Sequence, residues 1–246
     1  MNFFITGGSR GIGSSLVRDL VAAGHNVAFT YYSNETSASK LTEDIATDYP
    51  DRLCKAYHLD VRDSAWVERV GEQVEEDLET VDAVILNAAT NRSGLAVSTS
   101  DDDWREIIDV NLSGVFYVCR CFLPIFLSQR NGRFIHISSV ARHGMSGLSA
   151  YAASKAGLCG LSASLAKEYG RKGITSNVLT LGFFDTDMTR NQMPGSHKEF
   201  WNEFCPIGRI GVPSDISGAV LYLASEQASF VNGETISLTG GLNWGP

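Results

Sequence analysis

Proline and cysteine are scarce in this chain, and basic residues do not outnumber acidic ones. With six prolines in 246 residues, we find no proline-rich tract and no linker. The five cysteines form no CxxC pair and are odd in number, which indicates reduced thiols rather than a disulfide framework. The five histidines show no paired spacing of the kind that zinc sites use, so we expect no metal.

Long apolar runs and a basic surface are also missing. No apolar run reaches the roughly 18 residues that a membrane-spanning helix needs. Residues 1–6 lead directly into a glycine-rich motif, which leaves no room for a signal peptide. The net charge of −8 argues against nucleic-acid binding, because proteins of that class usually present a basic face. We therefore expect a cytoplasmic protein with no membrane and no nucleic-acid partner.

What the chain does contain is a regular alternation of short apolar runs and longer amphipathic segments. The short runs predict strands at residues 2–6, 26–31, 53–59, 83–86, 133–137, 175–181 and 235–238. The amphipathic segments predict helices at 11–23, 37–48, 64–78, 101–129, 149–170 and 216–224, the longest divided near Ser113. This order predicts a single α/β domain over residues 1–246, a Rossmann-type doubly wound, seven-stranded, mostly parallel sheet with helices on both faces.

One segment, residues 182–213, interrupts the alternation. It is rich in glycine, proline and aromatic residues, and it follows the carboxyl end of a predicted strand. Open α/β sheets place their ligands at such ends. A long irregular segment at that point is typical of a lid over a substrate, so we predict a substrate lid at about residues 183–213.

A glycine-rich turn lies between the first predicted strand and the first predicted helix, with the sequence TGGSRGIG at residues 6–13. Glycine allows the backbone to approach a diphosphate, and a helix N-terminus presents free N–H groups to it. A simple tight turn is the alternative, since the spacing is GxxxGxG rather than GxGxxG. NAD sites usually place an acid at the end of the second strand, but residues 30–34 read TYYSN. Because the Arg10 guanidinium suits a 2′-phosphate, the pattern favours NADP(H), with a solvated surface charge as the alternative.

Tyr151 and Lys155 are four residues apart, on one face of a predicted helix. An unperturbed tyrosine has a pKa near 10, so acid–base work near neutrality needs a lower value, which an ammonium group and a nicotinamide cation could provide. By itself this spacing is common on solvated helix faces. Ser138 and Ser139 end a predicted strand, and Asn111 is a polar residue in an apolar helical segment. A cap or kink is the alternative for Asn111, but together these residues favour a catalytic site.

Over essentially its full length the chain resembles the short-chain dehydrogenase/reductase family. The motifs that carry the resemblance are TGGSRGIG, Leu59-Asp60-Val61, Asn87-Ala88, Asn111, Ser139, the YAASK of residues 151–155, Thr186 and Gly240-Gly241. Within the family, the segments 182–189, 206–217 and 222–241 are most similar to the β-ketoacyl-(acyl-carrier-protein) reductases. The resemblance implies that NADPH is used to reduce a carbonyl, with a β-ketoacyl thioester as the first candidate, to a hydroxyl.

The resemblance also implies a catalytic set of Asn111, Ser139, Tyr151 and Lys155. In it Tyr151 donates the proton and Ser139 orients the carbonyl. Lys155 binds the nicotinamide ribose and lowers the tyrosine pKa, and Asn111 completes a proton relay.

The implied cofactor-binding residues lie at several points along the chain. They are Gly7, Ser9, Arg10, Gly11, Ile12, Gly13, Ser33, Asp60, Val61, Asn87, Ala88, Gly182, Phe184 and Thr186, together with Tyr151 and Lys155. Ser9, Arg10 and Ser33 would hold the 2′-phosphate. Asp60 and Val61 would border the adenine. Asn87 would lie on the adenosine ribose side, and Thr186 would bind the nicotinamide carboxamide.

Three features depart from the family pattern. Ala89 stands where the family has a glycine beside the cofactor, and Leu181 stands where it has a proline before Gly182. The interval between the serine and Tyr151 is also one residue short. Strand register therefore selects Ser139, whereas counting back from Tyr151 selects Ser138. We predict Ser139, with Ser138 as the alternative.

Partners are suggested by the resemblance as well. Reductases of this kind receive an acidic carrier protein on basic residues beside the site, and Arg130 and Lys172 align with those positions, with Arg133 and Arg171 next to them. Solvated helix ends are the alternative. Aromatic and apolar residues of the lid region either line an acyl pocket or pack the lid itself: Phe183, Phe184, Met193, Phe200 and Trp201. The resemblance further implies a homotetramer in which the apolar helices 110–126 and 151–165 pair across subunits.

Three functions stay open at this point. The first is reduction of a β-ketoacyl thioester, and the second is reduction or oxidation of a free small ketone, sugar or alcohol. The third is a nucleotide-binding regulator without catalysis. The complete catalytic set argues against the third, because a regulator needs no phenol and ammonium pair.

Overall fold

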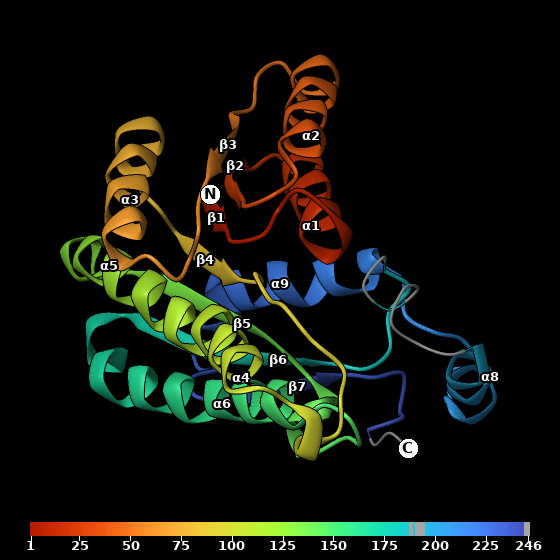
Figure 1. Ribbon diagram of the computed structural model, residues 1–246. Coiled ribbons are helices and arrows are strands. Elements are labelled where there is room, and N and C mark those ends of the chain that lie inside the picture. The colour runs from red at the N-terminus through yellow and green to blue at the C-terminus, as the bar shows by residue number, and fades with distance from the viewer. Residues whose placement is uncertain (187–188, 190–194, 244–246) are drawn as a thin grey trace.

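Seven parallel strands form the centre of the structure, a computed structural model that describes residues 1–186, 189 and 195–243 (Figure 1). In order across the sheet they are β3 (Cys54–His58), β2 (Asn26–Tyr31), β1 (Asn2–Ile5), β4 (Ala83–Leu86), β5 (Gly132–Ser139), β6 (Ile174–Leu181) and β7 (Thr235–Leu238). Each neighbouring pair is parallel. The predicted α/β fold with a seven-stranded sheet is confirmed.

Helices cover both faces of this sheet (Figure 1). They are α1 (Gly11–Ala22), α2 (Glu35–Asp48), α3 (Ser64–Leu78), α4 (Asp101–Ile108), α5 (Gly114–Gln129), α6 (Ser149–Tyr169), α8 (Gly195–Phe204) and α9 (Ser217–Ala224). Alternate residues of a strand face opposite layers. In β1, Phe3 and Ile5 pack with the α1, α2 and α9 layer, whereas Phe4 packs with the α3, α5 and α6 layer. Because both faces are covered, most strands appear in the sequence as apolar runs.

The strand order reverses between β1 and β4. From β1 the chain moves outward to β2 and β3, and from β4 it moves the other way to β5, β6 and β7. The loops that follow β1 and β4 therefore leave the sheet in different directions. This divergence opens the crevice at the carboxyl ends of the strands where sheets of this type bind ligands.

The predicted helical segment 101–129 is continuous but contains one irregular turn. α4 ends at Ile108, a π turn covers Asp109–Ser113, and α5 begins at Gly114, which confirms the predicted division. By length and composition alone this 29-residue stretch could cross a membrane. Its residues Val118 and Phe122 are buried in the core beneath it, and the core helix of a globular domain passes the same test.

Two expectations about local structure need correction. The predicted irregular segment 182–213 contains a ten-residue helix, α8. β6 is completely buried, yet it is not an apolar run, because Ser176 and Asn177 lie inside it. Their polar groups are hydrogen-bonded: Ser176 Oγ lies 2.9 Å from Ser162 Oγ, and Asn177 Nδ2 donates to the Val231 carbonyl at 2.7 Å. Buried polar residues are tolerated when they are paired in this way.

Candidate active site

A cleft of about 560 Å³ lies at the carboxyl ends of the strands. This volume is within the range of roughly 300–1,000 Å³ that is usual for small-molecule and cofactor sites. The structure brings together along this cleft all the residues expected to bind the cofactor: Gly7, Ser9, Arg10, Gly11, Ile12, Gly13, Ser33, Asp60, Val61, Asn87, Ala88, Tyr151, Lys155, Gly182, Phe184 and Thr186. Ser139 lines it too, whereas Asn111 is fully buried and is not among the lining residues.

Two glycines of the turn between β1 and α1, Gly7 and Gly13, have no room for a side chain. Gly7 has a φ of +69°, and a Cβ there would lie 3.0 Å from the Ala88 Cα. A Cβ on Gly13 would lie 2.2 Å from the Gly7 carbonyl oxygen. Asn87 holds the turn from the opposite loop, since its Nδ2 donates to the same carbonyl at 2.9 Å. No side chain caps the N-terminus of α1, so the backbone here fits a diphosphate group.

The cleft contains an uncompensated positive charge, although the net charge of the whole chain is negative. Its two carboxylates among the described lining residues are each paired with an arginine: Asp60 with Arg62 at 2.6 Å and Glu106 with Arg92 at 2.8 Å. Arg10 is exposed and makes no ion pair with another described residue. The chain carries a net charge of −8, yet this cleft presents an uncompensated guanidinium at one end. That arrangement favours an anionic ligand such as a dinucleotide phosphate.

At the other end of the cleft lie Tyr151 and Ser139, and the Ser139 hydroxyl acts to lower the pKa of the Tyr151 phenol. Lys155 is 3% exposed, and its Nζ donates to the Ile137 carbonyl at 2.8 Å. The Nζ atom lies 5.6 Å from the centroid of the Tyr151 ring. An acid–base phenol, a hydroxyl and an ammonium group therefore meet at one point of the cleft.

Burial dominates the electrostatics of this cluster. It raises the pKa of Tyr151 to about 12, and the Ser139 hydroxyl lowers it by less than burial raises it. Burial also lowers the pKa of Lys155 to about 8. In the chain by itself Lys155 does not offset the effect of burial on the phenol. Tyr151 is therefore protonated at neutral pH. The lowering expected from the ammonium together with a nicotinamide cation stays a prediction.

Adjacent serines at the end of β5 have different surroundings. Ser138 is 2% exposed, and its Oγ donates to the Lys155 backbone carbonyl at 3.0 Å. Ser139 is partly exposed, lines the cleft with Tyr151, and its Oγ accepts from the Ala141 amide at 3.2 Å. Because successive strand residues face opposite sides, only one of the two hydroxyls can face Tyr151.

Asn111 lies in the π turn behind the cleft. Its Oδ1 accepts from the Thr90 amide at 2.8 Å, and its Nδ2 donates to the Thr90 carbonyl at 2.9 Å. The same Nδ2 donates to Ser154 Oγ at 3.1 Å, and Ser154 in turn donates to the Tyr151 carbonyl at 2.7 Å. The side chain therefore fixes the loop after β4 to α6, while its part in a proton relay stays a prediction. Sequence reasoning missed Ser154, although it lies inside the YAASK motif.

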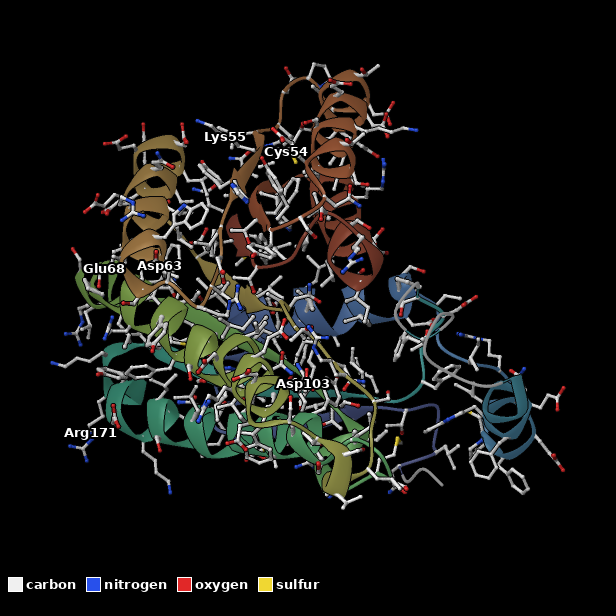
Figure 2. The ribbon with its side chains drawn as sticks, viewed as in Figure 1. Cys54, Lys55, Asp63, Glu68, Asp103 and Arg171 are labelled. Carbon is white, nitrogen blue, oxygen red and sulfur yellow. The ribbon has the colours of Figure 1, made fainter. Side chains whose placement is uncertain are left out.

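The basic residues predicted to meet a carrier protein do not lie beside the cleft of the same chain. Arg130 and Lys172 are exposed, but they precede β5 and β6 and so lie at the amino ends of these strands. In Figure 2 their neighbour Arg171 lies on the opposite side of the molecule from α8. Arg133 is 4% exposed and paired with Glu226 at 3.2 Å, so it is not available to a partner.

Aromatic residues of the lid region mostly pack with one another. The Phe183 and Trp201 rings are stacked with centroids 5.8 Å apart, in a small core that also contains Val140. Phe184 lines the cleft instead. Met193 lies outside the described residues.

Comparison with known proteins places the chain among nucleotide-dependent reductases. A family model described as Enoyl-(Acyl carrier protein) reductase matches residues 7–243. The chain is 39% identical over 239 residues to the 3-oxoacyl-[acyl-carrier-protein] reductase FabG of Salmonella typhimurium, which covers 97% of this chain and 95% of that protein. It is 38% identical over 248 aligned residues to FabG of Escherichia coli, with 98% and 99% covered. A gluconate 5-dehydrogenase from Burkholderia cenocepacia, solved in complex with NADP and tartrate, matches with a TM-score of 0.91 and 29% identity, over 98% of this chain and 94% of the other.

Proposed function

The chain belongs to the short-chain dehydrogenase/reductase family, and we propose that it is an NADPH-dependent ketoreductase that reduces a β-ketoacyl thioester to the hydroxyacyl thioester. The observation that carries the proposal is that Ser139, Tyr151 and Lys155 line the same cleft as the glycine turn. The thioester is supported by the relatives named 3-oxoacyl-[acyl-carrier-protein] reductase.

The nicotinamide, when bound, supplies the hydride that attacks the carbonyl carbon. Ser139 holds the carbonyl oxygen within reach of Tyr151, and as negative charge develops there the Tyr151 phenol donates its proton to that oxygen. A pKa of about 12 keeps this proton in place at neutral pH, so the raised value suits the reductive direction. The alkoxide that forms is a stronger base than a tyrosinate, so the transfer is downhill.

Lys155 has two functions in this proposal. One N–H of its Nζ is used on the Ile137 carbonyl, which orients the group and leaves its other donors for the ribose hydroxyls of the cofactor. As the proton leaves Tyr151, the ammonium next to the ring stabilises the tyrosinate that remains.

The preference for NADP(H) follows from the charge distribution in the cleft. Arg10 is uncompensated, and Ser9 and Ser33 line the same end. These donors fit a 2′-phosphate, and the similar gluconate 5-dehydrogenase was solved with NADP.

A second candidate is favoured by that same similar protein, which is a dehydrogenase of the free sugar acid gluconate. The test is a substrate panel: acetoacetyl thioesters against free ketones and keto-sugar acids, each with NADPH and with NADH, with turnover followed by nicotinamide absorbance. Turnover of a thioester with NADPH at a higher kcat/KM than any free ketone supports the proposal. If every thioester fails and a free ketone succeeds, the second candidate replaces it.

A homotetramer in the cytoplasm completes the proposal. α5 exposes apolar side chains that a partner would cover, among them Phe116 at 43% and Leu127 at 37% exposed. Arg130 and Lys172 lie at the amino ends of strands whose carboxyl ends carry the cleft, so a carrier protein docked there would serve the cleft of a neighbouring copy. Light scattering that gives a stable monomer would contradict this arrangement.

A further inference from the structure

Asp60 and Arg62 form a side-on ion pair at the adenine end of the cleft. Arg62 Nε donates to Asp60 Oδ1 at 2.9 Å, and Nη2 donates to Oδ2 at 2.6 Å. The Arg62 backbone amide also donates to Oδ1, at 3.0 Å. Both oxygens of the carboxylate are therefore bound by one residue, and the pKa of Asp60 lies below its ordinary value chiefly because of the Arg62 side chain. The acid is fixed in place and its charge is compensated.

The same guanidinium reaches across to the loop after β2. Arg62 Nη2 lies 3.3 Å from Tyr32 Oη, and the guanidinium carbon lies 5.7 Å from the centroid of the Tyr32 ring. Tyr32 and Asp60 both line the cleft, and Arg62, which contacts both of them, lies behind this lining. Arg62 thus joins the ends of β2 and β3, which are the two strand ends that flank the adenosine half of a dinucleotide in folds of this type.

One edge of the Arg62 guanidinium is available to bind another group. A guanidinium has five N–H donors. The contacts with Asp60 and Tyr32 use those on Nε and Nη2. Nη1 has no hydrogen-bond acceptor among the described residues, and the Arg62 side chain is 38% exposed. The group can therefore bind a second anion without releasing Asp60.

A 2′-phosphate carries a charge of about −1.5 to −2 at neutral pH. Beside an unpaired Asp60 carboxylate it would be repelled, and Arg10 alone would have to offset both charges. On the basis of the proposed function, we propose that Arg62 is a second determinant of NADPH preference: it neutralises Asp60 at the edge of the cleft and offers its Nη1 edge to the 2′-phosphate. The sequence motifs do not assign this role to Arg62, because its partners come from two different loops.

The test is to measure dissociation constants for NADPH and NADH by calorimetry, with the wild type, Arg62→Gln, and the double variant Asp60→Asn/Arg62→Gln. Arg69→Gln on α3 is the matched control, since Arg69 is exposed, has no ion pair among the described residues and removes the same charge. Thermal unfolding of each variant checks that it is folded.

We expect Arg62→Gln to lower the ratio of the NADH to the NADPH dissociation constant by about tenfold to a hundredfold, the range for a charge-assisted hydrogen bond. Arg69→Gln should leave this ratio within about twofold of the wild type. The double variant should recover part of the lost NADPH affinity, because Asp60 no longer repels the phosphate.

One result overturns the inference: an unchanged ratio of the two dissociation constants in Arg62→Gln. It arises when neither coenzyme loses affinity or when both lose it equally, and in the second case Arg62 only forms part of the adenine pocket. A folded Arg62→Gln with this result is decisive. If the wild type binds NADH more tightly than NADPH, the NADP(H) preference of the proposed function is wrong. This failure is seen in the wild type and is therefore distinguishable from a failure of the inference about Arg62, which is seen in the variant.

Discussion

Ser138 Oγ donates a 3.0 Å hydrogen bond to the Lys155 backbone carbonyl, which fastens the end of β5 to α6. Ser139, the next residue, lines the cleft with Tyr151 and lowers the pKa of its phenol. A strand alternates the directions of its side chains, so one serine supports the helix while the other faces the reacting groups. The two hydroxyls therefore differ in their consequences for stability and for turnover.

We expect Ser139→Ala to lower kcat by about a hundredfold or more, because it removes the group that orients the carbonyl oxygen. Ser138→Ala should keep kcat within about threefold but lower the free energy of unfolding by about 1–2 kcal/mol, since the Lys155 carbonyl loses its buried donor. Steady-state kinetics and urea unfolding of both variants measure the two effects. A larger loss of kcat in Ser138→Ala than in Ser139→Ala would reverse the assignment.

Burial of Lys155 makes a prediction about stability. Its pKa falls to about 8 from an ordinary value of 10.5. A folded-state pKa below that of the unfolded chain means that the charged lysine opposes folding below about pH 8, and that this penalty disappears as the pH rises toward about 10.5. The free energy of unfolding of the wild type should therefore increase relative to Lys155→Met over that interval, by at most about 3 kcal/mol.

Urea unfolding of both proteins at several pH values between about 7 and 10 measures this difference. Tyr151 is present in both proteins, so its own titration cancels. A difference that stays constant with pH would mean that the buried amine carries no charge penalty.

Close packing in the glycine turn predicts a strong effect of one added methyl group. Gly13→Ala would place a Cβ 2.2 Å from the Gly7 carbonyl oxygen, so the turn must shift, and we expect a loss of about 2 kcal/mol or more of stability together with NADPH binding. Gly218→Ala in α9 is the control, because a Cβ there meets nothing within 4 Å. That substitution should stabilise the protein by about 0.5–1 kcal/mol. Normal NADPH affinity in Gly13→Ala would show that the turn does not contact the cofactor.

Carrier-protein recognition is tested with a charge reversal far from the cleft. Arg130→Glu/Lys172→Glu should lower kcat/KM for an acyl carrier protein substrate by about tenfold or more, because it removes two cations from the docking surface. Activity with a small thioester such as acetoacetyl-coenzyme A should stay within about twofold, since neither residue lines the cleft. An equal loss with both substrates would point to damage of the fold.

The fold was predictable because its signal is repeated in every strand and helix. Buried parallel strands leave short apolar runs, and the helix periodicity between them fixes the crossovers. Element ends were predicted less well. The helix expected at residue 37 begins at Glu35, because the Asn34 side chain caps it by accepting from the Ser37 amide at 3.2 Å. A short polar residue before a helix is a signal that the sequence did contain.

Properties that depend on tertiary surroundings could not be predicted. The raised pKa of Tyr151 comes from burial, and no local motif reports how deeply a side chain is buried. The ion pair of Asp60 with Arg62 and the contact of Arg62 with Tyr32 depend on how two loops meet. The position of Arg130, in contrast, was within reach of the sequence, since a residue before a parallel strand lies at the edge away from the ligands.

Roles of the site residues stay predictions, although the structure gathers their side chains along one cleft. The central claim is that Tyr151 gives its proton to the substrate oxygen. Its most direct test is Tyr151→Phe, which removes only the hydroxyl: NADPH should bind with a dissociation constant within about twofold of the wild type, while kcat for acetoacetyl thioester reduction falls by about a thousandfold. A Tyr151→Phe enzyme that reduces the thioester at the wild-type rate would contradict the account.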